Sequence, residues 1–423
     1  MRPAVPLFAL LLYGIATLWI NDRLAWCIFQ LGVFALTAWT LVSARRLRLP
    51  AAAIPIVCAA LWPWLQIAFH ATAAPPNTVI EGLNWITFLA TFYLAAETLA
   101  DPGERRYFLA LATIAGTVMA VIAVLQRYTS NGKVYWLFPS GYTEDVFGPF
   151  VNRNQFAAWL ELIFPAALYL AGFATGRTRT LFAGAAAITF AVILASGSRA
   201  GAILALAEAI TIVATLTLRK RLQTTIPFLI LAVLATGVFG YDTLASRLHS
   251  SGPESVRLDA VRASVQMLRD KPLTGFGLGS WASVYPAYAG SDSGVTVNQA
   301  HNDWAQWAAE GGVPFAFFLA TFAFLLCKSA VPSIYGVGTV AFLLHAFLDY
   351  PMQQRPALAA WFFAVAGATA AWTNRPRQHD DGPLRGIGVR PNGVVRGDPA
   401  GLQTAGEAAA PRSVRGRPGA PAR

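Results

Sequence analysis

Twelve apolar segments, separated mostly by short polar connections, run through the first 373 residues of the chain. A helix that crosses a bilayer needs about 20 predominantly apolar residues. The pattern predicts membrane spans at about 4–20, 24–42, 51–70, 79–99, 107–126, 154–174, 180–196, 200–218, 225–240, 313–330, 333–348 and 357–373. We therefore expect an all-α, polytopic membrane protein with about 12 transmembrane helices.

The composition supports a membrane protein. Hydrophobic residues make up 56% of the 423-residue chain, and charged residues make up only 13%. Soluble domains are about half apolar and about a quarter charged. This balance excludes most soluble enzymes and disordered proteins. The three cysteines lie within apolar segments and match neither a zinc site nor a disulfide framework.

The positions of Lys and Arg predict the orientation, because cytoplasmic loops carry an excess of both residues. With a cytoplasmic N-terminus, alternate loops carry basic clusters, for example at 45–48 and 219–221. The intervening short loops carry only single arginines, Arg199 among them. The pattern places both termini in the cytoplasm. It also places the long loop of about 241–312, between the ninth and tenth spans, on the outer face of the membrane.

The C-terminal segment differs in composition from the rest of the chain. Residues 374–423 contain nine Arg and four acidic residues, which gives a net charge of +5, and no aromatic residue. A segment rich in Gly, Pro, Ala and Arg cannot bury a core. Without aromatic side chains it also lacks a platform for nucleic-acid bases. We predict a transmembrane domain at 1–373, a disordered cytosolic tail at 374–423 and no nucleic-acid partner.

The long outer loop contains two predicted helices. Residues 254–270 have an amphipathic pattern whose apolar stripe comprises Leu258, Val261, Val265 and Leu268, with Arg257 at its edge. A second short helix is expected over 303–310, capped by Asn302 and stopped by Gly311 and Gly312. The intervening Gly275-Phe-Gly-Leu-Gly279 lacks the flanking strand and helix of a dinucleotide fingerprint, so it indicates a tight turn instead.

Polar residues that could carry chemistry gather at the predicted outer edge. Arg199 is either an arginine that snorkels to lipid headgroups or a fork that holds a phosphate. His301 is either an ordinary capping histidine or a general base, and Arg257 is either solvated or directed at the membrane domain. Asn152, Arg153 and Asn154 either cap the sixth span or bind substrate. The outer acidic residues form no arrangement typical of a metal site, so no metal or other cofactor is expected.

Four further titratable residues remain without a predicted role. Glu161 and Glu208 lie within spans, where acidic residues are costly and often functional. His345 and Asp349 are one helical turn apart at the end of the eleventh span, where they either orient each other or finish the helix.

The residues resemble the O-antigen ligase and polymerase family of bacterial membrane glycosyltransferases. The resemblance covers about residues 140–360 and rests on the order and spacing of several segments. These segments are Gly148-Pro-Phe-Val-Asn-Arg-Asn-Gln-Phe-Ala157, Ser196-Gly-Ser-Arg-Ala-Gly201, the helix with Arg257, Lys271-Pro-Leu-Thr-Gly-Phe-Gly-Leu-Gly279, His301-Asn302 followed by Gly312, and His345 to Pro356.

The resemblance implies transfer of a glycan from a polyprenyl (undecaprenyl) diphosphate carrier to an acceptor sugar at the periplasmic face of the inner membrane. It implies catalytic roles for Arg199, Arg257 and His301. We expect substrate contacts from Asn152, Arg153, Asn154, Ser198, Asn302 and Gly312. The expected partners are the lipid-linked glycan donor, a lipid A core or glycan acceptor, and membrane lipids.

The chemistry of these residues fits a metal-independent, inverting transfer. Two arginines can neutralise a departing diphosphate, and a histidine can take the proton of the attacking hydroxyl. Transfer to lipid A core is the favoured prediction, and polymerisation of O-antigen or exopolysaccharide repeat units is the alternative. A protein O-glycosyltransferase and a lipid-linked glycan transporter are weaker alternatives, because the sequence shows no inverted repeat and its polar candidates lie at one membrane edge.

Overall fold

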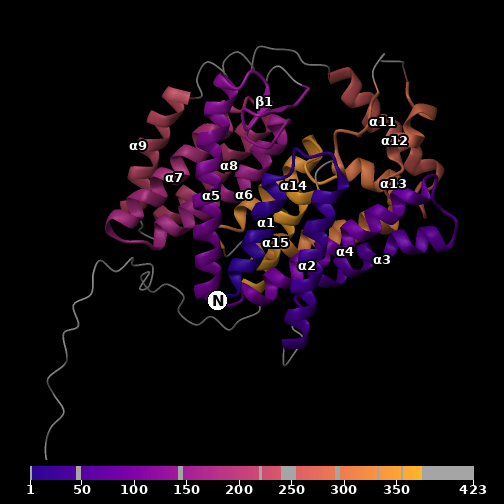
Figure 1. The fold of residues 1–423 in the computed structure, drawn as a ribbon, viewed down its shortest axis with the longest axis horizontal. Helices are drawn as coiled ribbons and strands as arrows, with labels where there is room; N and C mark the ends of the chain where they lie inside the picture. The colour runs from indigo at the N-terminus through magenta and orange to yellow at the C-terminus, as the bar shows by residue number, and fades with distance from the viewer. Residues whose placement is uncertain are drawn as a thin grey trace, which may run out of the picture. The chain divides into compact units, whose positions relative to one another are not determined.

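A computed structural model of the chain describes residues 2–43, 49–141, 146–218, 222–239, 254–290, 296–330, 333–353 and 356–373. The predicted tail at 374–423 and the loop residues 240–253 lie outside this part of the chain. Helices dominate the described residues, as Figure 1 shows. Their only sheet pairs two short strands, β1 (Lys133–Val134) and β2 (Phe138–Pro139).

The described residues form an all-α, polytopic membrane protein with two groups of apolar helices. Seven helices are long and apolar enough to cross a membrane: α2 (Arg23–Ser43), α4 (Pro75–Thr98), α5 (Pro102–Thr129), α6 (Arg153–Phe173), α7 (Gly176–Ala195), α8 (Arg199–Leu218) and α13 (Asp303–Ala330). Five shorter apolar helices join them: α1 (Ala4–Ala16), α3 (Ala53–Ala68), α9 (Leu222–Phe239), α14 (Val337–Leu348) and α15 (Pro356–Thr373). Each overlaps one of the twelve predicted spans.

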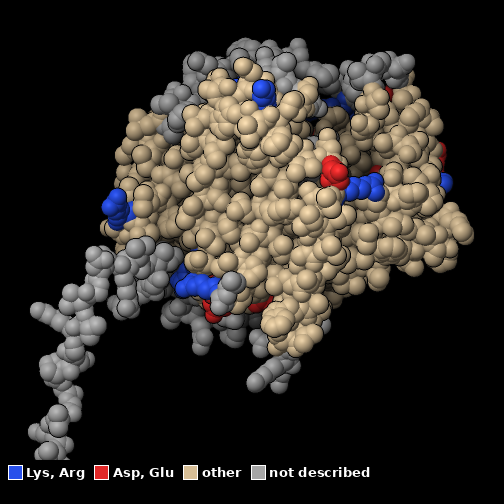
Figure 2. All heavy atoms as spheres, in the orientation of Figure 1, with Lys and Arg blue, Asp and Glu red and all other residues tan. Residues whose placement is uncertain are grey.

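Helix α6 forms the centre of the packing. Its residues from Gln155 to Phe173 are all buried, and it contacts α5, α7, α8 and α14. Helix α2 is the opposite case, with only Phe29, Gln30 and Val33 buried. Exposed apolar side chains such as Trp39 suit lipid contact, and Figure 2 shows a face on which charged side chains are few.

The predicted amphipathic helix is α11 (Glu254–Asp270), with the expected bounds, but its apolar stripe is not its buried face. Ala260, Ala263, Ser264 and Met267 are buried, whereas Leu258 is 50% exposed and Val265 is 41% exposed. The reason is the packing of α12 (Trp281–Val284) and the adjoining 3₁₀ turn η1 (Tyr285–Ala287) on α11. The rings of Trp281 and Tyr285 stack on each other and pack against the face of α11 that carries the small residues. Small residues let the rings approach, and Ser264 accepts a hydrogen bond from the Trp281 indole at 2.9 Å.

The expected helix over 303–310 and the tenth span form one kinked helix, α13. The break falls at Gly312, whose φ of 72° and ψ of −176° are not helical. Residues 272–273 fill the space beside it, because a Cβ on Gly312 would lie 2.8 Å from the backbone carbon of Leu273. The amide of Val313 donates to the carbonyl of Pro272 at 2.7 Å, so the kink holds the α11–α12 connection against the span.

The predicted tight turn at 275–279 is confirmed. Gly275, Gly277 and Gly279 all have positive φ. A Cβ on Gly277 would lie 2.1 Å from the hydroxyl oxygen of Thr72. Gln66 of α3 fixes the turn by donating to the carbonyl of Thr274 at 2.6 Å and accepting from the amide of Leu278 at 3.1 Å. The turn therefore anchors the segment 254–312 on the apolar helices.

Candidate active site

The connection between α14 and α15, residues 349–353, is bound to the first turn of α13. The carboxylate of Asp303, fully buried, accepts hydrogen bonds from the amides of Met352 at 3.0 Å and Gln353 at 3.3 Å. The amide of Asp303 donates to the carbonyl of Asp349 at 3.3 Å. We refer to residues 349–353 as the 349–353 loop. The hydrogen bonds to Asp303 fix this loop beside the residues that precede α13.

His301 lies between this loop and α13. Its φ of 54° is in the left-handed region, which side chains other than glycine rarely adopt. The next residue, Asn302, caps α13 by accepting from the amide of Ala305 at 2.9 Å and donates to the carbonyl of Phe347 at 2.8 Å. The imidazole meets the ring of Tyr350 edge to face, with centroids 4.7 Å apart. These contacts fix the chain at His301 and set its imidazole against the ring of Tyr350.

The surroundings of His301 favour the neutral imidazole. Burial lowers the pKa of His301, because a charged ring would lose hydration. The positive charge of Arg257 lowers this pKa further, and the negative charge of Asp349 opposes the shift. Nδ1 is buried and has no hydrogen-bond partner among the described residues. A neutral histidine with an unused nitrogen can accept a proton.

Asp349 connects the 349–353 loop with the start of α6. One of its carboxylate oxygens accepts a hydrogen bond from the side-chain amide of Asn154, and the other accepts from the amide of Tyr350 at 2.9 Å. Asn152 caps α6, because its side chain accepts from the amide of Asn154 at 2.8 Å. Asn152, Arg153 and Asn154 are all predicted to bind substrate. Among them, Asn154 is linked by its hydrogen bond to Asp349, whose charge acts on His301.

Arg199 is exposed at the first position of α8. Ser198 caps this helix, with its hydroxyl accepting from the amide of Gly201 at 3.1 Å. A Cβ on Gly201 would lie 2.6 Å from the Cβ of Ala157, so α8 begins in close contact with α6 just past Asn154. Arg199 thus starts a helix whose first turn is held against the first turn of α6.

Seven of the nine predicted site residues, all except Arg153 and Arg199, fall into two groups. Asn154, Arg257 and His301 cluster with Asp349, through hydrogen bonds or electrostatic interaction. Asn152, Ser198, Asn302 and Gly312 have structural roles as caps or as the kink. Substrate contacts from these four residues, and from Arg153 at the start of α6, stay predictions.

The structure also shows the surroundings of Glu161 and Glu208, the two intramembrane acidic residues without a predicted role. The Nδ1 atom of His345 lies 2.8 Å from a carboxylate oxygen of Glu161, and both side chains are fully buried. Glu208 is buried, and neither of its carboxylate oxygens has a hydrogen-bond partner among the described residues. His345 therefore pairs with α6, while Asp349 belongs to the site. The sequence offered no direct signal for Asp303 or Tyr350 as supports of the site.

Together the fold and the site define a polytopic, all-α membrane protein with a cluster of polar and titratable residues beside the ends of α6, α13 and α14. Residues 184–320 match the sequence model of the family described as O-antigen ligase. The match confirms the resemblance to the O-antigen ligase family and supports a membrane glycan-transfer function. Arg199, Arg257 and His301 lie within the matched residues, whereas Asn154 and Asp349 lie outside them. Comparison with curated proteins finds no match.

Proposed function

We propose that the protein is a glycosyltransferase that moves a glycan from a polyprenyl diphosphate carrier to an acceptor sugar at the outer face of the inner membrane. The observation that carries this proposal is the buried Nδ1 of His301, which has no hydrogen-bond partner among the described residues and lies within the electrostatic influence of Arg257. A proton acceptor beside a phosphate-binding cation is the arrangement that such a transfer requires.

The proposed reaction is a single displacement. An acceptor hydroxyl oxygen bonds to the anomeric carbon of the donor as the bond from that carbon to the diphosphate oxygen breaks. His301 takes the hydroxyl proton, and the polyprenyl diphosphate leaves with the bonding electron pair. Attack from the side opposite the leaving group inverts the anomeric carbon. General-base assistance of this kind contributes about 10²–10⁴-fold to the rate.

Arg257 and Arg199 bind the diphosphate in this proposal. A guanidinium is always charged and offers a planar fork of donors that matches phosphate oxygens. Arg257 serves a second purpose, because its charge adds to the lowering of the His301 pKa that burial causes. A bound diphosphate would partly offset this effect and make His301 more basic as the reaction begins. Participation of a metal is not expected.

Transfer to lipid A core, as in O-antigen ligation, is the proposed activity. The proposal rests on the description of the matched family at residues 184–320. The test is reconstitution of the purified protein with a polyprenyl-diphosphate glycan and either lipid A core or a repeat-unit glycan as acceptor. A product with the mass of glycan-bearing core supports ligation, a lengthened repeat-unit glycan indicates a polymerase, and no product with either acceptor contradicts the proposal.

Four variants test the assigned roles in the same assay. His301→Ala, Arg257→Ala and Arg199→Ala are each expected to abolish transfer while the protein still inserts and purifies. Arg199→Lys is also expected to transfer poorly, because lysine keeps the charge but lacks the fork. Full activity of His301→Ala would refute the general-base role, and full activity of Arg199→Lys would refute bidentate phosphate binding.

A further inference from the structure

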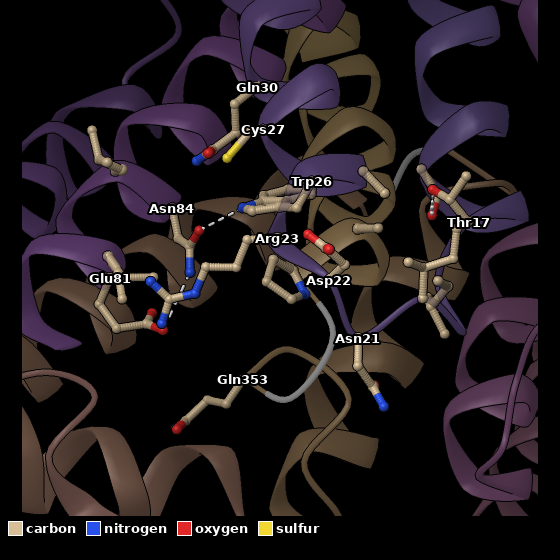
Figure 3. A pocket seen from close by; sticks show the side chains of 18 residues that line it. Thr17, Asn21, Asp22, Arg23, Trp26, Cys27, Gln30, Glu81, Asn84 and Gln353 are labelled. Carbon is tan, nitrogen blue, oxygen red and sulfur yellow. Dashed lines mark hydrogen bonds between the residues drawn. The ribbon is translucent and has the colours of Figure 1, made fainter. Parts of the chain in front are cut away.

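A cavity with polar and apolar lining residues lies between α1, α2, α4 and the 349–353 loop. Its volume is about 350 Å³, within the range of small-molecule sites. Figure 3 shows the side chains around it, with Arg23, Trp26, Glu81 and Asn84 grouped on one side and Gln353 entering from the loop below them in this view. None of the residues assigned above to the diphosphate or the general base lines this cavity.

The cavity wall contains a prearranged chain of hydrogen bonds. The indole N–H of Trp26 donates to the side-chain oxygen of Asn84 at 2.8 Å, and the amide nitrogen of Asn84 donates to a carboxylate oxygen of Glu81 at 3.2 Å. The second oxygen of Glu81 has no hydrogen-bond partner among the described residues, and neither has the guanidinium of Arg23. The wall thus offers fixed donors and acceptors to a ligand rich in hydroxyl groups.

The charge of the cavity distinguishes a sugar from a diphosphate. Arg23 contributes one positive charge and Asp22 one negative charge, and the carboxyl group of Glu81 adds no positive charge. A doubly charged diphosphate would therefore find no excess of positive charge there to neutralise it. Sugar hydroxyls can use both kinds of group, because they donate to carboxylates and accept from guanidinium and amide groups.

The cavity adjoins both the candidate active site and a lipid-facing surface. Gln353 lines it and also donates from its side chain to the carbonyl of Asp303 at 3.2 Å, two residues after His301. On α2, Leu24 is 66% exposed and Ile28 is 47% exposed, next to the lining residues Arg23 and Cys27. A glycolipid can therefore lay its apolar part on α2 and place its sugar beside the 349–353 loop.

We propose that this cavity binds the terminal sugar of the acceptor glycolipid and orients its hydroxyl for attack. This inference rests on the proposed transfer function and adds the site that selects the acceptor. Glu81 and Arg23 bind the sugar hydroxyls directly, and Trp26 and Asn84 hold Glu81 in place. The donor diphosphate stays outside the cavity, at Arg199 and Arg257.

Cys27 provides a reporter, because it lines the cavity and is exposed. The full chain with Cys58→Ser and Cys327→Ser, in phospholipid nanodiscs, is treated with a membrane-impermeant maleimide. Lipid-free core oligosaccharide, lipid-free repeat-unit oligosaccharide and polyprenyl-diphosphate glycan are each tested for protection. We expect one of the two oligosaccharides to slow the labelling of Cys27 at least about fivefold, and the donor to have little effect.

Variants of the wall then test the assignment. Glu81→Gln and Arg23→Gln should each raise the half-protecting oligosaccharide concentration about tenfold, as expected for the loss of one charged hydrogen bond. Arg23 is exposed, so its replacement does not endanger folding. Glu97→Gln is the matched control, since Glu97 lies near the opposite end of α4, and it should leave protection unchanged. The acceptor KM should rise in the two wall variants while the donor KM stays constant.

Two outcomes overturn the proposal: neither oligosaccharide protects Cys27, or the lipid-linked donor protects it as strongly as an oligosaccharide does. Transfer measured on the same preparations separates the two proposals. Transfer without protection refutes the cavity assignment alone. Protection without transfer refutes the enzymatic function and leaves a glycan-binding cavity.

Discussion

Replacement of Asp303 by alanine tests whether the 349–353 loop must be held in place for catalysis. The carboxylate of Asp303 accepts from two backbone amides, at 3.0 Å from Met352 and 3.3 Å from Gln353. It is fully buried, so water does not replace it readily when it is removed. Asp303→Ala therefore leaves two buried N–H groups without an acceptor unless the loop moves.

The size of the effect follows from these two bonds. A buried donor that loses its partner costs about 1–3 kcal/mol, so the pair costs roughly 2–6 kcal/mol. Even the lower figure corresponds to about a 30-fold change in an equilibrium. The loop is expected to leave its position, carrying Tyr350 away from His301 and Asp349 away from Asn154. We expect the transfer rate to fall by at least about 30-fold, with a lower melting temperature.

A matched control exists at the start of α5. The carboxylate of Asp101 also accepts from two backbone amides, those of Gly103 at 2.9 Å and Glu104 at 3.0 Å, but it is exposed. Water can replace it, so Asp101→Ala should cost about 1 kcal/mol and leave the transfer rate near wild type. Both variants are compared in the reconstituted transfer assay and in thermal unfolding in detergent. A normal rate and stability in Asp303→Ala, or equal damage in Asp101→Ala, would refute the reasoning.

Two further predictions concern His301 and Gly312. His301 must be neutral to take a proton, so transfer should decline as the pH falls through its lowered pKa, below about 6.5. Arg257→Gln removes a positive charge and should raise the pKa of His301, whereas Asp349→Asn removes a negative charge and should lower it. Modification of His301 by diethyl pyrocarbonate, followed by mass spectrometry across about pH 5–8, measures this pKa in each variant without turnover. Shifts in the same direction would contradict the electrostatic argument. Gly312→Ala should lower the melting temperature and the yield, because its Cβ would overlap the backbone of Leu273; an unchanged melting temperature would show that residues 272–273 can move away.

The sequence predicts the spans well, because length and apolar composition determine which segments enter a bilayer. It also predicts the bounds of α11 from periodicity. The sequence does not predict the buried face of α11. Periodicity identifies the most hydrophobic face, whereas the packing buries the face with small residues, against which the rings of Trp281 and Tyr285 fit. The predicted helix end at Gly312 is also only partly correct. The local pattern indicates a break in the helix, but it does not indicate that the chain continues beyond the break as part of one kinked helix.

The candidate site is only partly predictable for the same reason. His301 and Arg257 are identified by their residue types and by family resemblance. The support of His301 by Asp303, Asp349 and Tyr350 depends on contacts between segments about 50 residues apart in the sequence. No local pattern encodes such contacts, since they arise only when α13 packs against α14.

The binding of the 349–353 loop to Asp303 has a consequence for the synthesis of the protein. The ribosome completes Arg199, Arg257 and His301 long before it reaches the α14–α15 hairpin that supplies Asp349 and Tyr350. A nascent chain that has inserted all of residues 184–320 thus still lacks the support of its histidine. The site gains that support only after the last helical hairpin, α14–α15, has been made and the 349–353 loop has bound to α13.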